Sequence, residues 1–477
     1  MRANISGIKR KYVNNTRLQM CITFVNKILK SIGMTFRYIY ISLQKKSIVE
    51  PKIKISDYSY ELPENRIAKY PLPLRDSSKL LVYKDGKVSH SIFHDISTFL
   101  PENSLMVYNN TKVVPARLFF RKDTGAVIEV FCLEPVQPAD YVQSFASVGS
   151  CRWKAVLGNS KRWKGGRISL ICDYNTELNN DINKAQALNL QAELISKGDA
   201  MANVVEFSWE GSYTFSEVLD ICGRIPIPPY LNRETEQSDI ERYQTLYAQI
   251  KGSVAAPTAG LHFTDRVLSD IKNKGIEEMS VCLHVGAGTF IPVKSEYISG
   301  HKMHTEPISV TRELLVKLLE YKRKGRVIAV GTTSTRTLES LYYFGVHCIE
   351  RGEPGSVEQW EPYSENENDD CAETCTGGLL HGISVEDSLS AIIGYMGRNG
   401  LTSMKARTGI IIVPGYKYKI VDVLITNFHQ PQSTLLLLIS AFVGEEHWRE
   451  IYRYALDNDF RFLSYGDSSL LFGKNRI

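Results

Sequence analysis

Two kinds of hydrophobic pattern divide the chain. Between residue 116 and about residue 215, short segments alternate apolar and polar positions, as in residues 126–132 and 153–157, and Gly and Pro turns separate them. Such alternation is typical of half-buried strands, and several short strands at this spacing predict a small β-barrel or sandwich. Before this region, folded sequence is expected to begin near Ile55, with short strands over residues 79–83 and 105–108.

Beyond residue 216 the pattern becomes one of alternating strands and helices. Helical spacing of apolar residues covers 265–274 and 311–324, whereas 279–285, 326–330 and 420–425 are apolar runs that predict strands, the last two buried. This alternation favours α/β architecture.

Two connecting segments have distinctive compositions. The proline-rich segment 224–230 predicts an extended linker leaving the β-region, with a nucleic-acid contact through Arg224 and Tyr230 as the alternative. The acidic segment 361–373 predicts a mobile loop.

Composition and charge narrow the class of protein. Hydrophobic residues make up 43% and charged residues 23% of 477, which is ordinary for globular proteins and excludes a disordered, collagen-like or coiled-coil chain. The net charge of +5 is uneven, because residues 1–54 hold 12 Lys and Arg against one acid, while residues 345–408 hold 4 basic and 11 acidic residues. The remaining chain is nearly neutral, so the charge does not predict a nucleic-acid-binding face.

The N-terminal segment 1–53 is basic and poor in acids, and it is left out of the fold argument. It predicts a transit peptide or a non-native upstream start, with Met34 as a later candidate. No apolar run reaches the length of a membrane-spanning helix. The nine cysteines are an odd number without a CxxC pair, which favours reduced thiols and a cytoplasmic location. A zinc site at Cys371, Cys375 and His381 has no standard spacing and is disfavoured.

Five segments place glycine and polar residues just beyond apolar strands, where α/β proteins expose backbone N–H groups to ligands. They are residues 255–263, 283–290, 326–336, 426–431 and 464–467. Gly286 and Gly288 allow close approach of a ligand, although the third glycine of a dinucleotide fingerprint is missing. The hydroxyl residues 332–334 predict either helix capping or contacts to an anionic or hydroxylated ligand. Three histidines, His262, His284 and His429, lie in these segments.

Residues 301–306 bring two imidazoles and a carboxylate together and leave two interpretations open. His301, His304 and Glu306 have the donor types of a metal site, but HExxH is absent, and Gly300 and Pro307 argue against a helix. A role in hydrogen bonding and acid–base chemistry is therefore favoured over metal binding. The sequence has no GxxxxGK[ST] and no GxSxG motif, which disfavours a P-loop phosphotransferase and a serine hydrolase.

From residue 55 to 472 the chain resembles the S-adenosylmethionine:tRNA ribosyltransferase-isomerases, the enzymes of queuosine biosynthesis. The resemblance rests on residues 108–117, 255–263, 283–290, 301–306, 330–334, 426–431 and 462–467. It implies a discontinuous larger α/β domain, residues 54–117 and 216–477, with an inserted small β-barrel domain at 118–215. Segments 1–53 and 345–408 depart from the family pattern, as an N-terminal extension and an acidic insertion that touch none of these motifs.

The resemblance also implies a reaction. The ribosyl part of S-adenosylmethionine is transferred to 7-aminomethyl-7-deazaguanine at the wobble position of tRNA and isomerised, giving epoxyqueuosine and releasing adenine and methionine. S-adenosylmethionine is then a consumed substrate, no cofactor or metal is expected, and tRNA is the partner of a cytoplasmic, monomeric enzyme that needs no membrane.

The chemistry of that reaction suits particular residue types. The sulfonium acidifies C5′, so that a neutral base can remove a proton, and adenine needs a proton or hydrogen bond as it leaves. The candidates for acid–base catalysis are His262, His284, His304 and Glu306. The candidates for substrate binding are Asn109, Asn110, Arg117, Thr258, Phe263, Gly286, Gly288, Thr289, Phe290, His301, Thr332, Thr333, Ser334, Arg336, Asn427, His429, Tyr465 and Asp467.

Two other functions compete with this one. A metallohydrolase built on residues 301–306 predicts a stoichiometric metal and inhibition by chelators. A non-catalytic RNA-binding protein predicts tight tRNA binding without turnover, and the nearly neutral body disfavours it.

Overall fold

A ten-stranded mixed sheet forms the centre of the larger part of the molecule. The computed structural model describes residues 46–48, 50–172, 182–198, 203–286, 293, 295–366 and 382–474. Within that part of the chain the sheet strands, in spatial order, are β16 (Ser356–Val357), β18 (Ser403–Thr408), β14 (Glu306–Thr311), β13 (Glu277–Leu283), β4 (Ser104–Asn109), β15 (Arg326–Val330), β19 (Val423–Asn427), β20 (Ser468–Phe472), β2 (Lys79–Lys84) and β3 (Lys87–Ile92). The central strands β13, β4, β15 and β19 run parallel, so their carboxyl ends share one edge.

Strands β15 and β19 at the centre of this sheet are buried on both faces, which explains why they are nearly continuous apolar runs. In β15, Val327 and Ala329 pack on one face and Ile328 and Val330 on the other. The first face carries α9 (Arg312–Lys324), α10 (Gly331–Arg351), α11 (Val385–Arg398), α12 (Thr434–Val443) and α13 (Glu445–Asp457). The second face carries α3 (Ile96–Phe99) and α8 (Asp265–Asn273).

A closed barrel of six described strands is inserted between β5 (Thr111–Val113) and β12 (Ile250–Ser253), which confirms the inserted barrel that the family resemblance implies. Its strands are β6 (Arg117–Arg121), β7 (Val127–Gln137), β8 (Ser150–Gly158), β9 (Arg167–Leu170), β10 (Gln191–Ser196) and β11 (Asn203–Ser208). The period-2 pattern places Cys151, Trp153, Ala155 and Leu157 of β8 inside. The barrel core also includes side chains of α4 (Tyr141–Phe145), α5 (Ile182–Ala187) and α6 (Phe215–Cys222).

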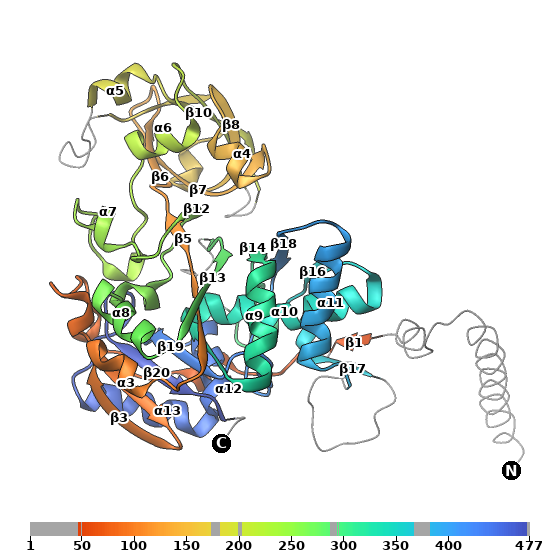
Figure 1. Ribbon diagram of the computed structural model, residues 1–477. Helices are drawn as coiled ribbons and strands as arrows, with labels where there is room; N and C mark the ends of the chain where they lie inside the picture. The colour runs from red at the N-terminus through yellow and green to blue at the C-terminus, as the bar shows by residue number, and fades with distance from the viewer. Residues whose placement is uncertain are drawn as a thin grey trace, which may run out of the picture.

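The barrel stands beyond one edge of the main sheet, and the parallel pair β5 and β12 runs between the two parts (Figure 1). Two ion pairs also join them, from Lys405 to Asp140 at 2.8 Å and from Arg407 to Glu134 at 3.2 Å. Both basic residues belong to β18, so the rim of the main sheet contacts the barrel directly.

The predicted elements agree with the structure except at the acidic segment. Residues 361–366 are not a loop but the 3-10 helix η11 (Glu361–Tyr363) and strand β17 (Ser364–Asn366), which pairs antiparallel with β1 (Lys46–Ile48). The prediction was wrong there because Tyr363 is anchored: its hydroxyl accepts a hydrogen bond from the Val413 N–H at 2.9 Å. Residues 367–373 lie outside the described residues.

The remaining elements are short helices. They are η1 (Ile55–Tyr58), η2 (Glu64–Arg66), η3 (Arg75–Ser77), η4 (Phe93–Asp95), η5 (Ser160–Arg162), η7 (Pro229–Leu231), α7 (Asp239–Arg242), η8 (Thr258–His262) and η10 (Ile298–Gly300). Among the described helices, none combines the length and apolar character that crossing a membrane requires.

Candidate active site

A cavity opens at the carboxyl ends of the parallel strands. Its wall includes Gly331, Thr332 and Thr333, directly after β15, and Thr426 and Asn427, which end β19. The antiparallel strand β14 begins at the same edge and contributes its first residue, Glu306. Segments far apart in the sequence thus meet where α/β sheets bind ligands.

The hydroxyl residues that follow β15 do not cap helix α10. The N-cap residue is Val330, which offers no capping side chain. Ser334 Oγ instead donates to the carbonyl of Val330 at 2.7 Å, as serine and threonine hydroxyls do within helices. Capping is therefore the wrong interpretation, whereas Thr332 and Thr333 line the cavity.

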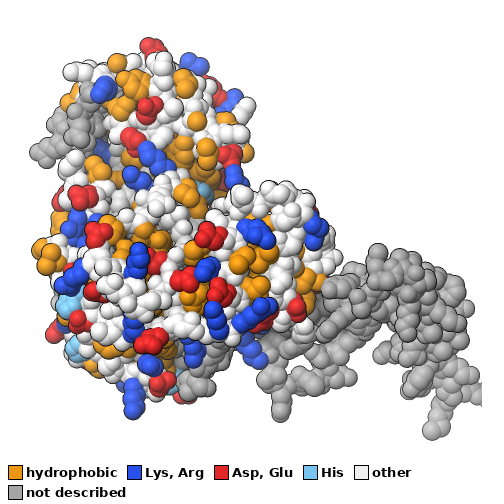
Figure 2. Space-filling model, in the orientation of Figure 1, with side chains coloured by type: hydrophobic (Ala, Val, Ile, Leu, Met, Phe, Trp, Pro, Cys, Tyr) orange, Lys and Arg blue, Asp and Glu red, His pale blue; other side chains and the backbone are white. Residues whose placement is uncertain are grey.

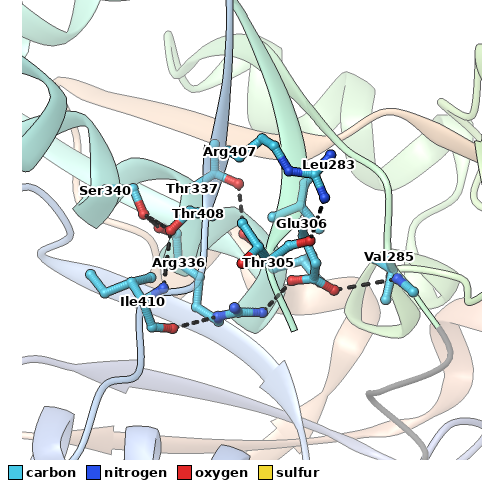
Figure 3. A network of polar contacts seen from close by, with 12 residues as sticks. Leu283, Val285, Thr305, Glu306, Arg336, Thr337, Ser340, Arg407, Thr408 and Ile410 are labelled. Carbon is cyan, nitrogen blue, oxygen red and sulfur yellow. Dashed lines mark hydrogen bonds and ion pairs between the residues drawn. The ribbon is translucent and has the colours of Figure 1, made fainter. Parts of the chain in front are cut away.

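Glu306 is the acceptor centre of a polar network at the cavity wall (Figure 3). Arg336 Nη1 donates to its Oε2 at 2.5 Å, and the Gly286 N–H donates to its Oε1 at 3.3 Å. The two charged side chains are 8% and 9% exposed. Arg336 Nε also donates to the Ile410 carbonyl at 3.1 Å, which fixes the plane of the guanidinium. These donors satisfy both oxygens of a carboxylate that is nearly inaccessible to water.

His262 is a buried neutral imidazole that orients Asn427. Asn427 Nδ2 donates to His262 Nε2 at 3.1 Å and to the Leu463 carbonyl at 3.2 Å. Since Nε2 accepts, Nδ1 carries the hydrogen and donates to Ser78 Oγ at 2.7 Å. Burial lowers the pKa of His262 to about 3. Asn427 Oδ1 is buried and has no hydrogen-bond partner among the described residues. Because Asn427 belongs to the cavity wall, this oxygen can accept a hydrogen bond from a ligand.

His284 lies between the main sheet and the barrel, away from the cavity wall. Its ring stacks on Tyr141 of α4, with centroids 4.2 Å apart and planes 10° apart. Burial lowers the pKa of His284 to about 4, so the stacked ring is neutral near pH 7. Cys282 Sγ is 3.6 Å from His284 Nε2, but burial raises the pKa of this thiol to about 12, so it is not an activated nucleophile.

Three further histidines line the cavity. His429 is held by a contact of 3.1 Å between its Nε2 and Thr426 Oγ1, and burial lowers its pKa to about 4. Burial and the neighbouring His304 lower the pKa of His301, whereas His304 itself is exposed. Within the described residues, no group of three or more His, Cys, Asp or Glu side chains has a metal-binding arrangement.

Besides His262, His284, Gly286 and Ser334, six predicted site residues support the surroundings instead of lining the cavity. Asn109 Nδ2 donates to the Leu283 carbonyl at 3.0 Å and Asn110 Nδ2 to Ser280 Oγ at 3.1 Å, so both tie β4 to β13. Phe263 is in the core under α8, and Arg117 pairs with Glu129 on the barrel.

The other two belong to the segment 464–467. Tyr465 OH donates to Asp239 Oδ1 at 2.8 Å, and Asp467 accepts the N–H groups of Lys79 at 3.0 Å and Arg461 at 2.7 Å. They fix this turn beside β2.

Some predicted residues are not covered. Gly288, Thr289 and Phe290 of the glycine segment lie outside the described residues, as do Cys371, Cys375 and His381. Of the remaining candidates, the cavity wall brings together Thr258, His301, His304, Glu306, Thr332, Thr333, Arg336, Asn427 and His429.

Comparison with known proteins shows which family contains this chain. The family model described as "Queuosine biosynthesis protein" matches residues 55–471. The chain belongs to this family. It is 37% identical over 424 residues to the S-adenosylmethionine:tRNA ribosyltransferase-isomerase of Halothermothrix orenii, covering 88% of this chain and 100% of that protein. The protein of the same name from Fusobacterium nucleatum is 38% identical over 421 residues, covering 88% and 97%.

A solved structure is also similar to this queuosine biosynthesis family member. The crystal structure of an S-adenosylmethionine tRNA ribosyltransferase from Thermotoga maritima matches 87% of this chain and 100% of its own, with 26% identity and a TM-score of 0.39.

The cavity of this family member includes residues that the sequence did not single out for substrate binding. Among them are Tyr230, Met303, residues 410–412, Gln430, Gln432 and Ser433. The sequence predicts Tyr230 as a linker residue or, alternatively, a nucleic-acid contact, whereas in the structure it lines the cavity and its hydroxyl lies 2.5 Å from Ser464 Oγ. The apolar run at 410–413 is buried, but no sequence pattern tells that the Ile410 carbonyl accepts a hydrogen bond from Arg336.

Proposed function

We infer that the protein is an S-adenosylmethionine:tRNA ribosyltransferase-isomerase of queuosine biosynthesis. It transfers and isomerises the ribosyl group of S-adenosylmethionine onto 7-aminomethyl-7-deazaguanine in the tRNA anticodon, forming epoxyqueuosine. The observation that carries this inference is the family match over residues 55–471, with relatives of this name matched over nearly their whole length.

The polar groups of the cavity suit the two chemical tasks of this reaction. The sulfonium of S-adenosylmethionine is a cation, and Glu306 is a buried anion on the cavity wall. We assign Glu306 to electrostatic stabilisation of the sulfonium side, since Arg336 and the Gly286 N–H already hold its two oxygens.

Proton transfer falls to an imidazole with access to the substrate. His304 is exposed and lines the cavity, and His301 beside it has a lowered pKa, which keeps its ring neutral and able to accept a proton. His262 is hydrogen-bonded to Asn427, and the ring of His284 stacks on Tyr141. We therefore assign both histidines to the positioning of neighbouring side chains and not to proton transfer.

Base recognition is assigned to the Asn427 side of the cavity. Its free Oδ1 is an acceptor for an N–H group of adenine or of the deazaguanine. Thr258, Thr332, Thr333 and His429 complete the polar wall around it.

The tRNA is proposed to bind by the shape of its anticodon loop with a modest electrostatic contribution. An unpaired wobble base is reached without melting a duplex. On the face in Figure 2, Lys and Arg are interspersed with Asp and Glu over the described surface. We further propose a cytoplasmic monomer divided at residues 54–117 and 216–477 for the larger domain and 118–215 for the inserted one.

Incubation of the full chain with S-adenosylmethionine and tRNA carrying the aminomethyl-deazaguanine tests the activity. Nucleoside mass spectrometry should detect epoxyqueuosine, and adenine and methionine should appear in equal amounts. Omission of S-adenosylmethionine is the control. tRNA binding without adenine release would favour a non-catalytic RNA-binding protein, and abolition of turnover by a chelator would favour metal-dependent chemistry.

A further inference from the structure

The first turn of α10 presents unused hydrogen-bond donors to the cavity. The backbone N–H groups of Gly331, Thr332 and Thr333 precede the first intrahelical hydrogen bond and have no acceptor within the helix. The N-cap residue Val330 adds no side-chain acceptor, and the first turn contains no acid. Gly331 has φ +87°, a conformation that favours glycine and turns the chain sharply from β15 into the helix.

A buried guanidinium group adds a second, independent donor. Arg336 is 7% exposed, and its Nε and Nη1 bind the Ile410 carbonyl and Glu306. Its Nη2 is buried and has no hydrogen-bond partner among the described residues, although the side chain lines the cavity. Thr333 Oγ1 is likewise buried without a hydrogen-bond partner among the described residues, and Thr333 lines the cavity. A buried charged donor left unsatisfied is costly, so its retention indicates a ligand acceptor.

We propose that the first turn of α10 and Arg336 Nη2 bind the carboxylate of the amino-acid end of S-adenosylmethionine. This assignment rests on the proposed function. A carboxylate offers several lone pairs in one plane, which suits a helix N-terminus and a planar guanidinium together. The ligand is a zwitterion next to the sulfonium, and the pair of Arg336 with Glu306 offers one charge of each sign to it.

A tRNA phosphate has the same anionic chemistry and is the other source of such a ligand. The geometry favours the small substrate, because Arg336 is nearly inaccessible and a backbone phosphate enters a site with its flanking nucleotides attached. If the site binds the carboxylate, a substitution at Arg336 weakens the binding of S-adenosylmethionine. If it binds a phosphate, the same substitution weakens the binding of tRNA.

The test compares S-adenosylmethionine with its decarboxylated analogue by isothermal titration calorimetry on the full chain. The wild type should bind the analogue roughly 10- to 100-fold more weakly, the loss of one or two charge-assisted hydrogen bonds. Arg336→Lys keeps the positive charge beside Glu306 but removes the second planar donor, so this ratio should fall severalfold. Arg351→Lys, an exposed arginine in the last turn of the same helix, is the matched control and should keep the wild-type ratio.

Each result of these binding measurements either supports or overturns the carboxylate subsite. Equal binding of both compounds by a wild-type enzyme that turns over overturns the carboxylate subsite and leaves the proposed function intact, whereas no binding of S-adenosylmethionine at all overturns both. If Arg336→Lys weakens tRNA binding and leaves the ratio unchanged, the subsite holds a phosphate and the proposal fails. Should Arg336→Lys not fold, Thr333→Val decides, because it should lower affinity for S-adenosylmethionine severalfold and spare the decarboxylated analogue.

Discussion

Replacement of Glu306 by glutamine probes the ion pair at the cavity wall. The substitution keeps the shape of the side chain and removes the charge that compensates Arg336. Both side chains are more than nine-tenths buried, and the contact between Arg336 Nη1 and Glu306 Oε2 measures 2.5 Å. Breaking a buried pair by neutralising one partner destabilises proteins by about 3–5 kcal/mol.

The contact with Gly286 adds to the stability that Glu306→Gln is expected to lose. Its N–H donates to Glu306 Oε1 at 3.3 Å, and a glutamine has only one acceptor oxygen for the two donors. One of them therefore loses its partner, which adds about 1–3 kcal/mol to the loss if that group stays dry. Turnover should also fall by roughly 100-fold, since an electrostatic stabiliser of the reacting charge is removed.

Urea denaturation and single-turnover assays measure the two effects separately. The double variant Glu306→Gln with Arg336→Met removes both charges and should recover part of the lost stability without recovering turnover. A free energy of unfolding within about 0.5 kcal/mol of wild type for Glu306→Gln would show that the pair is not energetically coupled, and the electrostatic argument would be wrong.

Other perturbations follow from the same geometry. His304→Ala should lower turnover by roughly 100-fold and leave the melting temperature unchanged, because the side chain is exposed on the cavity rim; wild-type single-turnover rates would remove it from proton transfer. Burial lowers the pKa of His262 to about 3 and those of His284 and His429 to about 4, so the unfolded chain takes up protons below pH 6.5 that the folded chain does not. The stability from these neutral rings is present above pH 6.5 and is lost as pH falls toward 4, by up to ~1.4 kcal/mol per pH unit for each histidine; equal urea midpoints at pH 7 and pH 5 would contradict this. Tyr141→Ala removes the ring stacked on His284, and faster limited proteolysis between the barrel and the main sheet is expected, with Tyr141→Phe as the control that keeps the stack. A chain starting at Pro51 should bind precursor tRNA with a log–log salt slope of about −2 to −4, and a slope steeper than about −6 would reveal a basic patch that net charge conceals.

The sequence by itself determined the architecture. Strict alternation in segments such as β8 gives one buried face and predicts the strands of a small barrel or sandwich, whereas the continuous apolar run of β15 predicts a strand buried on both faces within an α/β architecture. It also located the cavity segments, because glycine and hydroxyl residues directly after parallel strands gather at one edge of the sheet.

Tertiary structure decided what the individual side chains do. His262, His284 and His429 look alike in sequence, yet one orients Asn427, one stacks on the barrel and one lines the cavity. Glu306 and Arg336 belong to different segments of the chain, and only the tertiary fold, which brings the first residue of β14 to the start of α10, makes them a pair. Local patterns specify backbone conformation and burial, but hydrogen-bond partners brought together by long-range packing leave no periodic signal in the sequence.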